Sequence, residues 1–446
     1  MKITLSLFLI LITTWSLPLF SQPLTGIDDS TTVKERRAKW QIKTSSVSPS
    51  GRKVISVEPN SPLDEVGIIA DDVILALNEE VITNDNIWWD WVFNIRANVQ
   101  YQLTIKRGQQ VFKKLVSLNA IPLESYEQLT TEYDWIFSDY ALKQRTIITL
   151  PKNKNNKLPA IFILSGLSCS SIENTPGRKS NFVRALSHLI QHSNMLVMRV
   201  EKPGVGDSEG RCSETDFNTE LSGYEIALQK LLADPRIDRN NVIVYGNSMG
   251  SALAPYFANK YKLKGIISDG TFYRSWFEHM LEIERRILSM KGDNQATINH
   301  KMNTAYIPLY YGMLIEKKSF TQLITENPLL TPFNYHDLEH MYGRPMSFYH
   351  QMQDFNFAGE WSKLTSPVRI RWGTNDWIMS EYDINMITDV LATAGNTDVK
   401  VYKYPGLDHW HTVHQSSLHS FHGKRGNWEE KIGEQLVDWA TEISLQ

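Results

Sequence analysis

A serine between two glycines is the residue of this chain with the clearest chemical potential. Residues 246–250 read Gly-Asn-Ser-Met-Gly, after the apolar run Val-Ile-Val-Tyr at 242–245 and before a run of small residues. This pattern predicts a strand, a sharp turn and a helix. Glycine on both sides of the serine leaves room where a Cβ would collide with neighbouring backbone. A serine at such a turn projects its hydroxyl clear of the sheet, so Ser248 is the candidate nucleophile.

A serine hydroxyl needs a base to take its proton, and the base needs an acid to orient it. Asp376 follows the apolar run 368–372, and His409 follows the run 399–402. Both are expected on loops at the carboxyl ends of strands, where open α/β sheets place their ligands. Asp269 is the alternative acid and His411 the alternative base. The sequence thus predicts acyl transfer by Ser248, His409 and Asp376.

Acyl transfer also needs two donors for the oxyanion of the tetrahedral intermediate. We expect the first donor to be the backbone N–H of Met249, directly after the nucleophile. The second is expected in the segment Ser-Gly-Leu-Ser-Cys at 165–169, which follows the apolar run 160–164. Gly166 lets the backbone approach closely, and the N–H of Leu167 is the predicted donor.

These features together resemble an α/β-hydrolase of the serine aminopeptidase-like and esterase-like group, over residues 133–446. The resemblance implies the chain order nucleophile, acid, base. In that group a His-Gly pair is frequent where this chain has Ser165-Gly166, a departure that keeps the backbone donor and leaves the substrate class open. The motifs that carry the resemblance are 202–208 (Lys-Pro-Gly-Val-Gly-Asp-Ser), 246–250, 373–376 (Gly-Thr-Asn-Asp) and 406–409 (Gly-Leu-Asp-His).

The two cysteines of the chain follow neighbouring motifs of this resemblance. Cys169 closes the expected oxyanion loop, and Cys212 follows the 202–208 motif. The strands before these loops are neighbours in the strand order of the family, so both loops are expected on one rim. In an oxidising compartment the pair is predicted to form a disulfide; the alternative is two unrelated buried thiols.

Short apolar runs alternate with helical segments along the same part of the chain. Such runs suit a sheet buried on both faces, so we expect a doubly wound, mostly parallel α/β sheet. Residues 272–364 hold helical, aromatic- and Met-rich sequence without an expected strand, which predicts a cap inserted over the site. The expected strands are 147–150, 160–164, 196–200, 242–245, 265–268, 368–372 and 399–402.

Residues 35–118 form a separate compact unit in the sequence, followed by an expected linker at 119–132. A Ser-Pro-Leu run at 61–63, the strand-like segment 71–78 and a hairpin turning at Arg107-Gly108 resemble a bacterial PDZ domain. The resemblance implies that an extended peptide C-terminus docks on an exposed sheet edge. The candidate carboxylate loop, 50–53, lacks the expected Gly-apolar-Gly-apolar pattern. The alternative is a structural module packed against the rest.

The N-terminus reads as a secretory signal. Met1-Lys2 precede an apolar run at 3–20, and Ser21-Gln22 give a polar exit. We expect residues 1–21 to be removed and the protein to be exported, periplasmic or secreted, with no later membrane span. The alternative is an uncleaved membrane anchor, since the run is just long enough to span a bilayer.

Charge and histidine spacing bear on the remaining function classes. With 46 Lys and Arg against 49 Asp and Glu, the formal charge of −3 gives no electrostatic basis for nucleic-acid binding. Asp408, His409, His411 and His414 also allow a metal-dependent hydrolase as an alternative, although no metal or cofactor is expected.

The predicted function is an exported serine hydrolase that cleaves carboxylic esters of a small-molecule substrate through an acyl-enzyme. One alternative is a serine peptidase or aminopeptidase with peptide substrates, because the same triad serves both reactions. A second alternative is a PDZ-based binding protein whose hydrolase domain is not catalytic.

Overall fold

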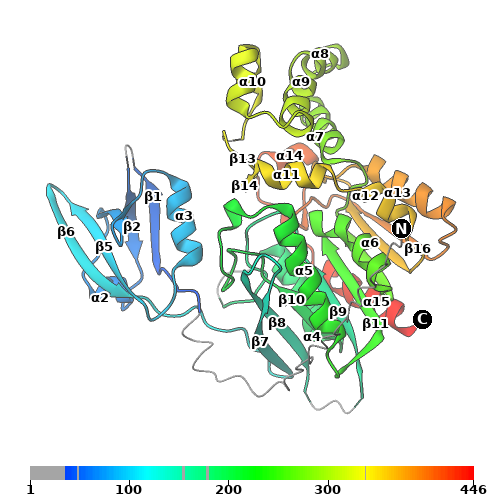
Figure 1. Cartoon of the computed structure of the whole chain (residues 1–446), viewed down its shortest axis with the longest axis horizontal. Coiled ribbons are helices and arrows are strands. Elements are labelled where there is room, and N and C mark those ends of the chain that lie inside the picture. The colour runs from blue at the N-terminus through cyan, green and yellow to red at the C-terminus, as the bar shows by residue number, and fades with distance from the viewer. Residues whose placement is uncertain (1–35, 48–49, 153–155, 177–179, 337) are drawn as a thin grey trace, which may run out of the picture.

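The computed structural model describes residues 36–47, 50–152, 156–176, 180–336 and 338–446, which form two units, each with its own apolar core (Figure 1). The predicted signal peptide, 1–21, and the first residue of the predicted N-terminal unit lie outside the described residues. Among the helices that are described, none combines the length and apolarity that a membrane crossing needs.

The larger unit is built on one mixed sheet of eight strands. Two antiparallel strands stand at one edge, and the other strands run parallel to one another. This arrangement is the α/β-hydrolase fold, and it confirms the predicted doubly wound sheet. The order across the sheet is β7 (Leu129–Phe137), β8 (Lys143–Pro151), β10 (Leu196–Val200), β9 (Leu158–Leu164), β11 (Ile237–Asn247), β12 (Gly265–Asp269), β15 (Val368–Gly373) and β16 (Val399–Tyr404).

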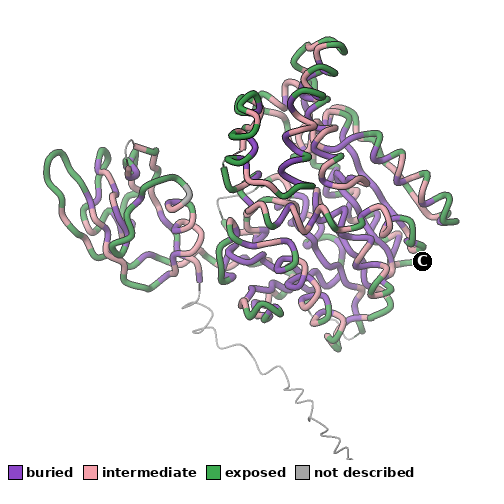
Figure 2. The backbone as a smooth tube through the Cα atoms, turned by 45° about the horizontal axis from the view of Figure 1, so that its top comes forward, coloured by how far each residue is buried: buried purple, intermediate pink, exposed green. Residues whose placement is uncertain are grey.

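Helices cover both faces of this sheet, which explains why its central strands are apolar on both sides. Figure 2 shows the resulting concentration of buried chain in the middle of the larger unit. One face carries α4 (Asn181–His192) and α15 (Lys431–Leu445), whereas the other carries α5 (Phe217–Leu232), α6 (Met249–Tyr261) and α13 (Glu381–Thr393). A short ladder of β17 (Thr412–Val413) and β18 (Asn427–Trp428), with α14 (Ser417–Phe421), completes the C-terminal part.

A mostly helical insertion separates β12 from β15 and stands above the sheet (Figure 1). It begins at a capping box, in which Ser275 and Glu278 satisfy each other's backbone N–H groups. The insertion consists of α7 (Trp276–Met290), α8 (Gln295–Lys301), α9 (Ile307–Tyr310), α10 (Phe320–Glu326), α11 (Met346–Gln353), α12 (Phe357–Ser362), π-helical turns at Met302–Tyr306 and Tyr311–Ile315, a 3-10 turn at Pro328–Phe333, and the two-residue strands β13 (His340–Met341) and β14 (Arg344–Pro345).

The N-terminal unit has a six-stranded sheet with β1 at one edge and β6 at the other. Its core includes the rings of Trp40, which precedes β1, and Trp88, with centroids 5.0 Å apart. Leu103 and Ile105 of the sheet belong to the same apolar cluster. Its elements are β1 (Ile42–Ser46), β2 (Arg52–Val57), α2 (Pro62–Glu65), β3 (Val73–Leu77), β4 (Glu80–Val81), α3 (Asp85–Asn94), β5 (Gln100–Arg107) and β6 (Gln110–Ser117).

Three details of the structure differ from the sequence-based expectation. Strand β1 was not predicted, because its polar sequence Ile-Lys-Thr-Ser-Ser lacks an apolar run. Strand β7 starts at Leu129, inside the expected linker 119–132, since its polar residues pair with β8 along the whole strand. In the candidate carboxylate loop 50–53, Arg52 and Lys53 belong to β2, and Arg52 forms an ion pair with Asp85 of α3 at 2.7 Å.

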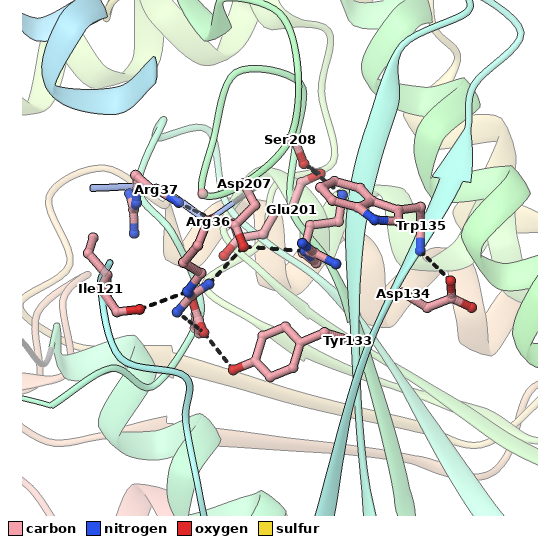
Figure 3. A network of polar contacts seen from close by, with 12 residues as sticks. Arg36, Arg37, Ile121, Tyr133, Asp134, Trp135, Glu201, Asp207 and Ser208 are labelled. Carbon is pink, nitrogen blue, oxygen red and sulfur yellow. Dashed lines mark hydrogen bonds and ion pairs between the residues drawn. The ribbon is translucent and has the colours of Figure 1, made fainter. Parts of the chain in front are cut away.

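A buried arginine joins the two units (Figure 3). Arg36 is 2% exposed and donates to Glu173 at 2.5 Å and to Asp207 at 2.8 Å, both of the larger unit. Burial disfavours the charged guanidinium, but the two carboxylates outweigh it and raise the pKa of Arg36. Arg96 adds hydrogen bonds to the backbone oxygens of Asp207 and Ser208 at 3.2 and 3.1 Å. The N-terminal unit is therefore fixed to the loop that carries the 202–208 motif.

Candidate active site

Ser248 stands at the strained turn that the sequence predicts between β11 and α6. Its φ of 55° is unusual for a residue with a side chain. A Cβ on Gly246 would overlap the carbonyl oxygen of Gly250, and one on Gly250 would overlap that of Leu164. Both neighbours are backbone atoms of packed elements, which explains the requirement for glycine at these two positions.

The structure brings Ser248, His409 and Asp376 together in one chain of hydrogen bonds. The Nε2 atom of His409 lies 3.0 Å from Ser248 Oγ, and its Nδ1 atom lies 2.8 Å from Asp376 Oδ2. Their positions follow from the sheet, because Ser248 directly follows β11, and Asp376 and His409 lie in the loops after β15 and β16 at the same edge. A base in this geometry can take the serine proton while the acid holds the imidazole in one tautomer.

Asp376 is itself held in place by backbone donors. Its Oδ1 atom accepts the N–H groups of Ile378 and Met379, both at 2.8 Å, and Oδ2 is left for His409. Burial disfavours the charged imidazolium of His409, but the Asp376 carboxylate outweighs this effect, so the pKa of His409 lies above its ordinary value. The site therefore favours proton uptake by His409.

The alternative acid and the alternative base lie beside this arrangement and bond to each other. His411 Nε2 is 2.8 Å from Asp269 Oδ2. Asp269 also accepts Arg371 Nε at 3.0 Å, and its backbone oxygen accepts the N–H of Ser248 at 2.8 Å. Asp269, held by His411, thus supports the turn through its backbone oxygen, and neither side chain bonds to the Ser248 hydroxyl.

The two expected oxyanion donors line the same cavity as Ser248. Within the described part of the chain, the N–H groups of Leu167 and Met249 donate to no protein acceptor. The loop that bears Leu167 passes close to the nucleophile, because a Cβ on Gly166 would lie 3.0 Å from Ser248 Cβ. The ammonium group of Lys202 supports this loop by donating to the carbonyl oxygens of Gly166 and Ser168.

Cys169 and Cys212 are joined by a disulfide between the oxyanion loop and the loop after the 202–208 motif. The guanidinium of Arg344, at the base of the insertion, donates to Cys212 Sγ at 2.7 Å and also bonds to Glu220. The disulfide therefore ties the loop that bears Leu167 to the segment that follows the neighbouring strand, β10.

A cavity of about 660 Å³ opens beside Ser248 between the sheet and the insertion. Of the described residues that line it, none is Asp, Glu, Lys or Arg. The sequence identified the reacting groups, Met249, His411 and the oxyanion loop of this lining, but no substrate-binding residue in the aromatic walls, because those walls come from distant segments. Its aromatic walls are formed by Phe182, Phe272, Trp276, Tyr342, Trp377 and Trp410.

The histidines considered as metal ligands turn toward different partners. His409 bonds to Ser248 and Asp376, and His411 bonds to Asp269. His414 lies 3.1 Å from Asp408 and hydrogen-bonds to Thr412 at 2.8 Å. No cluster of three or more potential ligands is gathered within the described ranges.

Comparison with known proteins gives one curated relative at low identity, and no family model matches the chain. Over 295 residues the chain is 21% identical to Esterase EstD of Thermotoga maritima. The aligned region covers 66% of this chain and 64% of the relative, so it spans less than two thirds of that protein.

Solved structures match the chain at lower sequence identity. Est1E from Butyrivibrio proteoclasticus, solved with ferulic acid, is 16% identical with a TM-score of 0.45 and covers 70% of this chain and 98% of its own. An acylaminoacyl peptidase from Pyrococcus horikoshii is 13% identical with a TM-score of 0.43, covering 78% of this chain and 48% of its own.

Proposed function

We propose that this protein is a serine hydrolase that cleaves carboxylic esters through an acyl-enzyme. The observation that carries the proposal is the chain of hydrogen bonds from Ser248 through His409 to Asp376 at the mouth of a cavity. In this reaction Ser248 attacks the ester carbonyl while His409 takes its proton, and the proton then goes to the leaving alcohol. Water attacks the acyl-enzyme in the second half, with His409 again as base.

The remaining groups take their roles from their places around Ser248. Asp376 holds the imidazole and stabilises its charged form, and its two backbone donors fix the carboxylate for that role. The N–H groups of Leu167 and Met249 stabilise the negative oxygen of the tetrahedral intermediate. The support for this role is that both donors border the cavity without a protein acceptor.

The cavity walls favour an ester over an aminopeptidase substrate. An aminopeptidase must bind the ammonium group at the substrate's N-terminus, and a buried charge without an opposite charge beside it is costly. The described lining residues include no carboxylate, whereas they include several aromatic rings. The name of the curated relative, an esterase, agrees with this preference.

We also infer that the protein is exported and that residues 1–21 serve as its signal peptide. The disulfide between Cys169 and Cys212 supports this, because such bonds persist in oxidising compartments. Docking of a peptide C-terminus on the PDZ-like unit is a further proposal, supported by the position of β1 at the edge of its sheet.

The test is a substrate panel with the purified mature protein. We expect 4-nitrophenyl esters of short acids to be hydrolysed and 4-nitroanilides of amino acids to be turned over at least about 100-fold more slowly in kcat/KM. Ser248→Ala should lower ester hydrolysis by on the order of 10⁴-fold or more. Ser362→Ala, at the exposed last residue of α12, is the matched control and should leave the rate unchanged. Equal ester turnover by Ser248→Ala would refute the proposal, and a preference for the anilides would make the protein a peptidase.

A further inference from the structure

His279 is a buried histidine in the cavity wall that the proposed reaction does not use. It lies in the first turns of α7, has 0% exposure, and lines the cavity that Ser248 and His409 border. Within the described part of the chain, neither of its ring nitrogens has a hydrogen-bond partner. A buried polar group without a partner costs free energy, so an unpartnered imidazole in the cavity wall calls for a ligand.

The rings around His279 hold it in one orientation. Phe272 stacks on it with centroids 4.7 Å apart and planes at 23°, and Trp276 lies 5.1 Å away on the same helix. These contacts immobilise the imidazole without using its nitrogens. The ring nitrogens are thereby held in fixed positions beside the rings of Phe272 and Trp276.

The imidazole of His279 is neutral at ordinary pH. Burial lowers its pKa well below the usual value, and the positive charges of Arg286 and Arg274 act in the same direction. A neutral imidazole has one N–H donor and one nitrogen acceptor. It can bond to an uncharged hydroxyl with either atom, whereas it offers no countercharge to a carboxylate or an ammonium group.

We propose that His279 is a substrate-binding residue that recognises an uncharged hydroxyl on an aromatic ring of the ester. The aromatic walls accept a flat ring, and the hydroxyl group supplies the partner that the imidazole lacks. This inference rests on the proposed esterase function and names the substrate class of that site. A hydroxylated ring in the acyl part and one in the alcohol part of the ester offer the imidazole the same chemistry, and the experiment distinguishes the two.

The experiment compares matched esters with and without the hydroxyl. For the acyl part, these are 4-nitrophenyl phenylacetate and its 3- and 4-hydroxy derivatives; for the alcohol part, 2-phenylethyl acetate and its 3- and 4-hydroxy derivatives on the ring. We expect the wild type to prefer a hydroxylated member of one series by about tenfold in kcat/KM, the effect of one satisfied hydrogen bond. His279→Phe keeps the stacking and should reduce that preference to less than twofold.

Two further variants separate recognition from structure. His279→Gln retains a donor and an acceptor and should keep part of the preference, even if His279→Phe folds poorly. His300→Phe, at an exposed histidine of the insertion, is the matched control and should keep the full preference. The inference is overturned if the wild type shows no preference in either series, or if His279→Phe retains it.

Binding distinguishes a failure of this inference from a failure of the proposed function. Titration of 2-phenylethanol and 2-(4-hydroxyphenyl)ethanol, together with the 3-hydroxy isomer, is followed by ligand-observed NMR in wild type and His279→Phe. Tighter binding of a hydroxylated alcohol, lost in the variant, supports the inference even if no ester is turned over. The inference is contradicted if all three alcohols bind equally and if, within each series, the hydroxylated and unsubstituted esters are turned over equally. The esterase function then still stands.

Discussion

At the scale of single residues, the site depends on how one carboxylate acts through one imidazole. Asp376 lies 2.8 Å from His409 Nδ1 and is fixed by two backbone donors, so its charge is presented to the imidazole without rearrangement. The alternative acid, Asp269, is occupied by Arg371 and His411 and acts as a support of the turn. Asp376 and Asp269 both follow strands in the sequence, and their different bonding partners in the structure show which of them orients His409.

The raised pKa of His409 sets the pH dependence of activity. Because His409 must be neutral to act as a base, kcat/KM for a neutral ester should rise with pH and reach half of its maximum above 6.5, the ordinary value for histidine. The Asp376 carboxylate favours the protonated imidazole, so Asp376→Asn should move the midpoint to lower pH and reduce the rate by about 10³- to 10⁴-fold. The exposed Asp389→Asn is the control and should leave the profile unchanged. A wild-type midpoint at or below 6.5 would contradict this reading of the ion pair.

The reacting residues could be predicted from the sequence because each is attached to a local pattern. Ser248 lies between Gly246 and Gly250 after an apolar strand, and Asp376 and His409 lie in the loops that follow two further strands, so the order of elements alone brings them together. His279 has no such signal. A single histidine on an amphipathic helix has the pattern of any core or surface position. Only the three-dimensional structure shows that Phe272 and Trp276 pack on its ring and that its nitrogens have no partner among the described residues.

At the scale of elements, the site is a set of loops braced against one another at the carboxyl ends of the strands. The oxyanion loop after β9 is held by Lys202, which follows β10, and by the disulfide to Cys212. These strands are neighbours in the sheet, so the braces are short. The polar strands β1 and β7 were missed at this scale, because pairing with a neighbouring strand and not an apolar run determines where they lie.

Loss of the disulfide should destabilise the larger unit and loosen the oxyanion loop. The bond closes a loop with a sequence separation of 43, for which the chain-entropy model gives about 4 kcal/mol of unfolding free energy. The double variant Cys169→Ala/Cys212→Ala should show a loss of this order in urea unfolding, and reduction of the wild type should reproduce it. An unfolding midpoint equal to that of the oxidised wild type would show that the bond adds no stability.

At the scale of the whole molecule, the N-terminal unit is fixed to the loops around the site. Arg36 bonds to Glu173, which follows the oxyanion loop, and to Asp207 of the neighbouring loop. Figure 3 shows the contact with Asp207. Both carboxylates are distant from Arg36 in sequence, so no local pattern could have predicted the contact. The sequence indicated two units, and only the three-dimensional structure shows how they are joined.

Removal of the Arg36 charge should weaken this joint. Arg36→Met removes the ion-pair partner of the buried Glu173 and one of the two arginines paired with the buried Asp207, the other being Arg145. Removing one partner of a buried ion pair typically costs about 3 kcal/mol or more. We expect a lower thermal midpoint, faster proteolysis between the units near residues 119–128, and a lower kcat with little change in KM. Lys39→Met, at an exposed ion pair with Glu58 of the same unit, is the control and should behave as wild type. Identical behaviour of Arg36→Met and wild type would mean that the joint carries no stability.

The central claim is that Ser248 is an activated nucleophile, and covalent labelling tests it most directly. The mature protein is treated with a fluorophosphonate, digested and examined by mass spectrometry, beside Ser248→Ala and the control Ser362→Ala. The structure predicts that wild type and Ser362→Ala carry the label on the peptide that contains Ser248, and that Ser248→Ala carries none. Absence of label from the wild type, or equal labelling of Ser248→Ala, would contradict the account.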